Sequence, residues 1–224
     1  MPEQVALIHT SPTMIPVFKT LTAELLPPAK TNVFNMVDES LLCDIIRDGC
    51  CPAATARRLA GHVMSAADAG AKYVLVTCSS MGRAVEAARA LVPATVLRVD
   101  EPMANEAVRL GKRIGVIATL PSTLEPTAAL IKTRAAAANK PIELTSRVVE
   151  GAFQAVIGGD GAKHDQLVGA ALRELARQVD VIVLAQASMA RVVDALSPAD
   201  KPVPILSSPR LAIEHLASLV NGTK

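Results

Sequence analysis

The feature that most constrains the fold of this 224-residue chain is an internal repeat of nearly half its length. In chain order, the matches are residues 8–12 (IHTSP) with 117–121 (IATLP), 48–49 with 160–161, 73–81 (YVLVTCSSM) with 181–189 (VIVLAQASM), and 102 with 209. A generic likeness between any two strand–helix halves is the alternative explanation, but the matched turns are polar and keep their order. The repeat therefore indicates a duplicated architecture.

Short apolar runs alternate with longer amphipathic or Ala-rich stretches along the chain. Expected strands are 5–8, 32–37, 73–77, 95–99, 113–118, 142–148, 181–185 and 204–206, and expected helices include 53–69, 83–91, 163–178 and 209–220. This alternation predicts an α/β fold with doubly wound parallel sheets. We expect a first half over 1–100, a second half over 101–207, and a C-terminal helix over 208–224 that packs back on the first half.

Composition excludes several classes of protein. The chain has 23 basic and 21 acidic residues, a net charge of +2, no Trp and only four aromatic residues. Such a weak charge and so few stacking groups argue against nucleic acid or a membrane surface as a partner. No apolar run approaches the ~20 residues that span a bilayer, and the first residues do not resemble a signal peptide. We expect a cytoplasmic protein with reduced thiols.

The repeated turns follow the expected strands, at the sheet edge where open α/β folds bind ligands. The candidate site residues are Thr10, Ser11, Cys78, Ser79, Ser80, Thr119, Ser122, Gln186, Ala187 and Ser188. Ser122 with Glu125 also fits a helix capping box, which is a purely structural role. If the halves face each other, the turns of Cys78 and Gln186 meet across a pseudo-twofold axis, with the ligand in the cleft between them.

Cys78 is the cysteine placed for chemistry. It lies between a buried run and an expected helix start, where the helix dipole lowers the pKa of a thiol. The alternative is an inert, buried cysteine, but the neighbouring hydroxyl groups favour function. Cys43 is expected in a helix core, and Cys50 and Cys51 are expected to be structural.

Other reactive motifs are missing from the sequence. It has no GxGxxG after the first strand, no GxxxxGK[ST], no GxSxG and no HExxH. Residues 158–161 (GGDG) precede a helix without a tight strand before them, which predicts a turn and an N-cap. No spacing of Cys and His suggests a metal site. We therefore expect neither a cofactor nor a metal.

The whole chain resembles the aspartate/glutamate/hydantoin racemase superfamily. The resemblance is carried by residues 7–12 (LIHTSP), 37–41 (VDESL), 77–80 (TCSS) and 100–103 (DEPM). It implies two facing domains with four-stranded parallel sheets and a cofactor-independent site. In that superfamily one cysteine removes the proton alpha to a carboxylate and a second cysteine protonates the opposite face. The first cysteine corresponds to Cys78, whereas the position of the second is occupied by Gln186 in residues 184–189 (LAQASM).

An amide is neither an acid nor a base at neutral pH, so the expected function is a one-cysteine variant of an isomerase or racemase. Cys78 would be the base or nucleophile, and Gln186 would orient a small carboxylate or ring-amide substrate about 7–10 Å away. Alternatives are a one-cysteine lyase or decarboxylase, and a small-carboxylate binding protein without activity. A thiolate at Cys78 at neutral pH would distinguish an enzyme from a binder. The sequence leaves homo-oligomerisation open.

Overall fold

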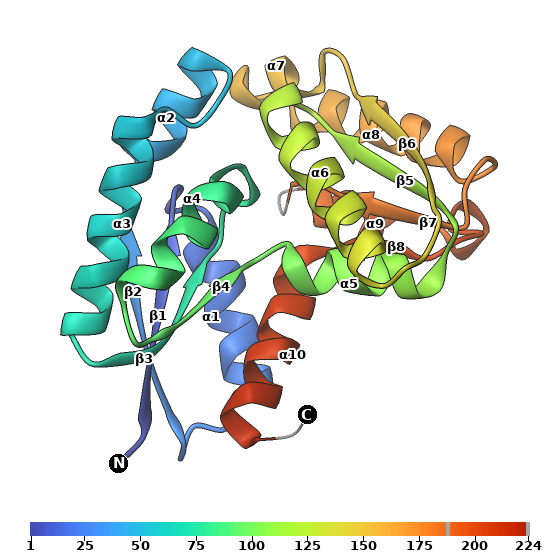
Figure 1. Cartoon of the computed structure of the whole chain (residues 1–224). Helices are drawn as coiled ribbons and strands as arrows, with labels where there is room; N and C mark the ends of the chain where they lie inside the picture. Colours follow the sequence, from blue (N-terminus) through green and yellow to red (C-terminus); the bar gives the residue numbers. More distant parts are fainter. Residues whose placement is uncertain (187–188, 223–224) are drawn as a thin grey trace. The chain divides into compact units, whose positions relative to one another are not determined.

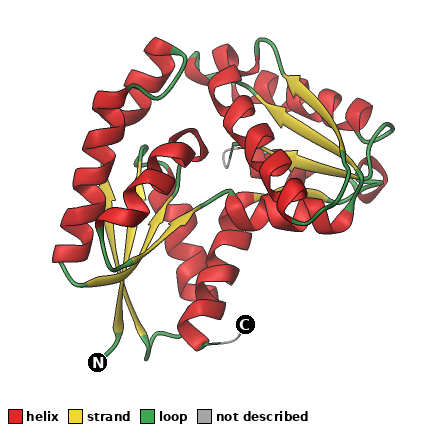
Figure 2. Cartoon of the chain, viewed as in Figure 1, coloured by secondary structure: helices red, strands yellow, loops and turns green. Residues whose placement is uncertain are grey.

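The computed structural model describes residues 1–186 and 189–222. The chain divides into two compact units, one made of Met1–Glu101 with Pro209–Lys224 and the other of Pro102–Ser208. Each unit contains a four-stranded parallel sheet with helices against it (Figures 1 and 2). The predicted α/β class with four-stranded parallel sheets is therefore confirmed.

The sheet of the first unit has the strand order β2-β1-β3-β4. Its strands are β1 (Glu3–His9), β2 (Thr31–Val37), β3 (Ala71–Val76) and β4 (Thr95–Arg98). The inner parts of the two central strands, residues 5–8 of β1 and 73–76 of β3, are buried runs because helices cover both faces of the sheet. Ile8 of β1 pairs with Met36 of β2 on one side and with Val76 of β3 on the other.

Helices lie on both faces of this first sheet. They are α1 (Met14–Leu25), α2 (Glu39–Asp48), α3 (Ala53–Asp68), α4 (Gly82–Ala88) and α10 (Ser208–Asn221), with short 3-10 helices at Ser79–Met81 and Arg89–Leu91. Apolar residues of α2, α3 and α4 form one core with one face of the sheet. The other face packs against α1 and α10, which lie side by side (Figure 1).

The sheet of the second unit has the order β6-β5-β7-β8. Its strands are β5 (Arg113–Ala118), β6 (Glu143–Val148), β7 (Val181–Leu184) and β8 (Ile205–Ser207). Its helices are α5 (Glu101–Leu110), α6 (Pro121–Ala137), α7 (Ala152–Ile157), α8 (Gly161–Leu175) and α9 (Ala190–Ala195), with a 3-10 helix at Pro198–Asp200. Helices α7, α8 and α9 share one core with β5 and β7.

The two sheets have the same topology, as the sequence repeat predicts. In each, the first strand of the unit lies between the second and the third, so the direction of winding reverses between β1 and β3 and between β5 and β7. Such a reversal opens a crevice at the carboxyl ends of the two central strands. Open α/β sheets generally bind their ligands at this position.

Two local predictions from the sequence are wrong. The N-cap of α6 is Leu120, in extended conformation and without a side-chain capping bond, so Ser122 lies inside the first turn and forms no capping box. Cys43 of α2 is exposed rather than part of the core, because Leu41 and Ile45 occupy the buried face of that helix. The predicted N-cap Asp160 is confirmed, since its side chain accepts a hydrogen bond from the backbone N–H of Lys163.

No helix among the described residues is long and apolar enough to cross a membrane.

Candidate active site at the carboxyl ends of the central strands

Cys78 lies two residues beyond the end of β3, in the turn that leads into α4. Its backbone is extended, and the chain then tightens into the 3-10 helix Ser79–Met81, where the N–H of Met81 bonds the carbonyl of Cys78 at 3.2 Å. The thiol is partly buried, and Ser79 and Ser80 beside it are each only 8% exposed. The turn therefore carries a thiol and two hydroxyl groups that are largely shielded from solvent.

Four polar groups near the Cys78 sulfur favour its anion. They are the hydroxyl groups of Thr10 and Ser80 and the backbone N–H groups of Ser80 and Met81. Burial nevertheless raises the pKa of the Cys78 thiol, and these donors only moderate the rise because each favours the thiolate. The predicted lowering of this pKa by the helix start is thus wrong in direction: the loss of water outweighs the donors.

Thr10 reaches Cys78 because it follows β1, the neighbouring central strand. His9, the last residue of β1, is fully buried, with Nδ1 2.9 Å from Oγ1 of Thr77 and Nε2 2.9 Å from Oδ1 of Asn35. Burial lowers the pKa of His9, so the ring is held neutral between three strands. His9 is therefore a structural support for the edge that carries Thr10.

Gln186 takes the corresponding place in the second unit, two residues beyond β7. Its Oε1 accepts hydrogen bonds from the backbone N–H of Thr119 at 2.6 Å and from the Thr119 hydroxyl at 2.9 Å. Thr119 follows β5, the neighbouring central strand. Since Oε1 is held by Thr119, the group that Gln186 can offer to a substrate is its Nε2 amide, which is a donor.

The structure thus brings candidate residues together within each unit. In the first unit Thr10, Ser79 and Ser80 gather at Cys78, whereas Ser11 bonds the exposed Thr13 at 2.8 Å in the loop before α1. In the second unit Thr119 holds Gln186, and Ser122 lies in the first turn of α6. Ala187 and Ser188 lie outside the described residues. The facing arrangement of Cys78 and Gln186 stays a prediction.

The remaining cysteines differ in their surroundings. Cys50, like Cys43, is exposed, and Cys51 packs with Cys78 against the core of the first unit. Burial raises the pKa of Cys51, and repulsion from a charge on Cys78 adds to the rise. Across residues 1–186 and 189–222, no three His, Cys, Asp or Glu side chains form a group suited to a metal ion.

A buried ion pair beside the Cys78 turn escaped the sequence analysis. Arg98, at the end of β4, is 4% exposed and Asp100 is fully buried. Arg98 donates to both carboxylate oxygens of Asp100, with Nε–Oδ1 at 3.0 Å and Nη2–Oδ2 at 2.8 Å. The sequence contains a signal for this pair, because two opposite charges flank Val99 at the end of a buried strand.

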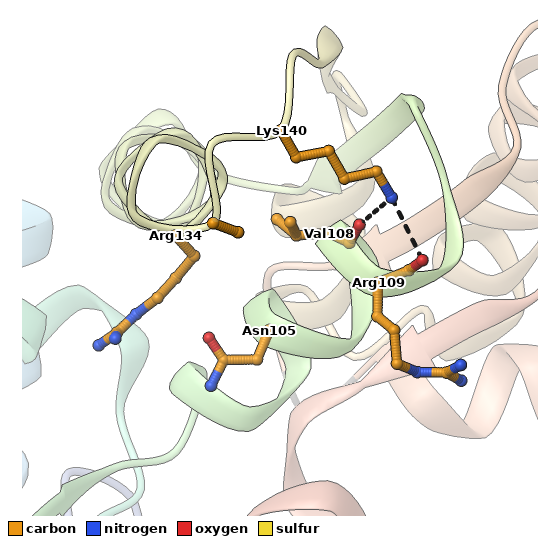
Figure 3. Close-up of a pocket in the computed structure, with 6 residues that line it drawn as sticks. Asn105, Val108, Arg109, Arg134 and Lys140 are labelled. Carbon is orange, nitrogen blue, oxygen red and sulfur yellow. Dashed lines mark hydrogen bonds between the residues drawn. The ribbon is translucent and has the colours of Figure 1, made fainter.

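A separate pocket of about 400 Å³ lies between α5 and α6 of the second unit (Figure 3). Its lining residues are Asn105, Val108, Arg109, Arg134, Ala138 and Lys140. The ammonium group of Lys140 bonds the carbonyl oxygens of Val108 and Arg109 at the end of α5, and Arg109 pairs with Glu106. The guanidinium groups of Arg109 and Arg134 point away from each other, so the pocket has no converging donors.

Comparison with known proteins gives a family for the chain. Residues 6–216 match the family model described as Asp/Glu/Hydantoin racemase. No curated protein sequence matches the chain. Because the family model covers most of its length, the chain belongs to the Asp/Glu/hydantoin racemase family.

Solved structures of several racemases share the fold at low sequence identity. Aspartate racemase from Picrophilus torridus has a TM-score of 0.73 at 11% identity, covering 98% of this chain and 94% of that one. Allantoin racemase from Klebsiella pneumoniae has a TM-score of 0.71 at 16% identity, covering 98% and 88%. Glutamate racemase from Bacillus anthracis has a TM-score of 0.70 at 18% identity, covering 98% and 82%. These three proteins are named for three different substrates, so the shared fold does not select one.

Proposed function

We propose that this protein is a cofactor-independent isomerase of the racemase type, which acts on the carbon alpha to the carboxylate or ring amide of a small substrate. Its family supports racemase-type chemistry. The observation that carries the proposal is the Cys78 turn, where a partly buried thiol at the reversal point of the sheet lies among polar groups of Thr10, Ser80 and Met81 that favour its anion. A sulfur that only filled space would not need donors that favour its anion.

In the proposed reaction, the Cys78 thiolate removes the alpha proton of the substrate. The S–H bond forms as the C–H bond breaks, and the electron pair moves onto the adjacent carbonyl or carboxylate oxygen. The Nε2 amide of Gln186 donates a hydrogen bond to that oxygen, which stabilises the developing charge. Ser79, Ser80, Ser188 and the backbone of Ala187 bind the substrate carboxylate, and Thr10, Ser11, Thr119 and Ser122 complete the lining.

Gln186 sets a limit on the proposed reaction, because an amide has no proton to give at neutral pH. The carbanion is then protonated by the Cys78 thiol on the face from which the proton left, or more slowly by water. Repeated return to the same face exchanges the alpha proton with solvent and preserves the configuration. We therefore expect exchange to be faster than inversion.

The test uses incubation in deuterium oxide with L-aspartate and, separately, a 5-substituted hydantoin. Mass spectrometry measures incorporation of deuterium, and chiral chromatography measures inversion. Cys78→Ser is expected to abolish both, while Cys43→Ser, which alters an exposed cysteine, leaves them unchanged. Exchange that persists in Cys78→Ser would contradict the proposal, and release of carbon dioxide would indicate a decarboxylase.

A second candidate is a protein that binds small carboxylates without turning them over. The raised pKa of Cys78 favours it, because a thiol that stays protonated at neutral pH is a poor base. In this case carboxylates protect Cys78 from iodoacetamide, but no deuterium enters the alpha position. Protection together with exchange supports the enzyme.

A further inference from the structure

The buried pair of Arg98 and Asp100 lies directly beside the strand that carries Cys78. In the sheet, Arg98 of β4 is the register partner of Val76, the last residue of β3. The N–H of Val99 then bonds the carbonyl of Val76 at 3.2 Å, so the two chains remain joined as they leave the sheet. The side chain of Arg98 therefore leaves the sheet at the carboxyl ends of the strands, the same edge that carries the Cys78 turn.

Arg98 also holds the beginning of α4. Its Nη1 donates to the carboxylate of Glu86 in that helix, while Nε and Nη2 remain on Asp100. The guanidinium group lies against the backbone of Gly82, the first residue of α4. A Cβ on Gly82 would lie 2.8 Å from Nη1 and closer still to Nη2 and Cζ. Position 82 thus has room for glycine only while Arg98 is in place.

Gly82 directly follows the turn that begins at Cys78. The N–H of Met81, the residue just before Gly82, bonds the carbonyl of Cys78 at 3.2 Å. The N–H groups of Ser80 and Met81 also favour the Cys78 thiolate. A shift of Gly82 would move this turn, because the 3-10 helix spans only Ser79–Met81. The guanidinium group against Gly82 is in a position to hold the turn beside Cys78.

We infer that Arg98 is a positioning residue for the proposed active site: anchored by Asp100 and Glu86, its guanidinium group supports Gly82 and so holds the Ser79–Met81 turn in place beside Cys78. The inference rests on the proposed function only where it gives Cys78 a catalytic role. The contacts of Arg98 are the same whatever Cys78 does. The planar fork of an arginine can meet two carboxylates and a backbone at once. A lysine ammonium group cannot reproduce these three contacts.

The experiment measures the rate of alkylation of Cys78 by iodoacetamide from pH 6.5 to 10.5, with each cysteine followed separately by mass mapping. In Arg98→Lys and Gly82→Ala, a displaced turn should carry the polar groups of Ser80 and Met81 away from the sulfur. The Cys78 profile should then shift to higher pH, with a reaction about three- to tenfold slower at pH 8. Glu86→Gln, which changes a partly exposed anchor, should give a smaller shift in the same direction.

Matched controls separate positioning from general destabilisation. Gly61→Ala adds the same methyl group in α3, where a Cβ meets nothing within 4 Å. Arg89→Lys alters an arginine of the same unit that bonds Glu101 and the carbonyl of Val96. Both should keep the wild-type Cys78 profile. Circular dichroism establishes which variants are folded. If Arg98→Lys and Gly82→Ala do not fold, the Cys78 profile of Glu86→Gln tests the inference.

An unchanged Cys78 profile in the folded variants would overturn the inference. Alkylation needs no substrate, so this result is independent of the proposed function. Conversely, a shifted profile in Arg98→Lys with no exchange or inversion by the wild type would support the positioning role and overturn the proposed isomerase.

Discussion

At the scale of single residues, a threonine holds the central polar group of each unit. The Thr10 hydroxyl group favours the Cys78 thiolate, and the Thr119 hydroxyl and backbone N–H donate to Gln186. Both threonines follow the first strand of their unit, and their partners follow the third. Equivalent positions thus supply donors in both units, although one partner can ionise and the other cannot.

Replacement of Thr10 by Val is expected to raise the pKa of Cys78 further. The substitution keeps the shape of the side chain and removes a donor that favours the thiolate, so the midpoint of alkylation should rise by about one pH unit. Alkylation by iodoacetamide, quenched at set times over a range of pH and followed by mass mapping, measures this midpoint. Thr20→Val, which removes an exposed hydroxyl bonded to the carbonyl of Pro16, is the control and should not move the midpoint. A midpoint that falls would contradict the donor role.

Replacement of Gln186 by Cys is expected to increase racemisation. The Thr119 donors that now bind an amide oxygen suit a thiolate equally well, and a thiol supplies the missing acid. A general acid contributes typically ~10²–10⁴ in rate, so chiral chromatography should detect the gain. Gln154→Cys places a new thiol on the exposed part of α7 and should give no gain. Rapid racemisation by the wild type, unaffected by changes at Gln186, would show that another residue is the second catalytic group.

At the scale of secondary-structure elements, helix α8 shows how a short polar segment fixes a helix start. Asp160 accepts from the N–H of Lys163 at 3.0 Å. Asp160→Ala should lower the free energy of unfolding by about 1 kcal/mol, and Asp160→Asn should keep most of it, because an amide oxygen can also cap. Urea unfolding followed by circular dichroism measures both. Equal loss in the two variants would mean that the charge of Asp160, rather than its hydrogen bond, stabilises α8.

The elements were largely predictable from the sequence because their signals are local. Continuous apolar runs such as Val181–Leu184 mark buried parallel strands, and the Gly-rich segment before α8 marks its cap. The start of α6 was not predictable in this way. Pro121 begins the helix one residue before Ser122, and its fixed φ serves the helix start without a side-chain cap.

At the scale of the whole molecule, the carboxyl ends and the amino ends of the central strands have different roles. In the second unit the carboxyl ends of β5 and β7 carry Thr119 and Gln186. At the amino ends of the same strands, Asp180 accepts from the backbone N–H groups of Lys112 and Arg113 at 3.0 and 2.9 Å and pairs with the Arg113 guanidinium group. These contacts join the two central strands at the edge away from the candidate site.

Replacement of Asp180 by Asn is expected to weaken the dependence of stability on acid. The N–H and guanidinium groups of Arg113, with the N–H of Lys112, lower the pKa of Asp180 to about 2. Because the folded pKa is below the usual value near 4, this stabilisation is present above pH 4 and is lost as the pH falls toward 2. The decrease in Tm from pH 7 to pH 3 should be smaller in Asp180→Asn. Glu125→Gln, an exposed carboxyl group of the same unit, should retain the wild-type decrease.

The candidate site was predictable only in part. The repeat identified the turns of Cys78 and Gln186, because polar residues after buried strands are visible in the sequence. The direction of the pKa shift of Cys78 depends on how closely Thr10, Ser80 and the core surround the sulfur, which no local pattern encodes. The contact of Arg98 with Gly82 joins residues from a strand and a helix, and only the folded chain brings them together.

The return of α10 to the first unit has a consequence for synthesis of the protein. Ala212, Ile213 and Leu216 complete a core that begins with Val5 and Leu7, whereas the second unit ends at Ser208. During synthesis, all residues of Pro102–Ser208 therefore leave the ribosome before α10 does, whereas the core of the first unit lacks Ala212, Ile213 and Leu216 until that helix has been made. We expect the second unit to be able to complete its fold before the Cys78 unit, the reverse of the usual amino-terminal-first order.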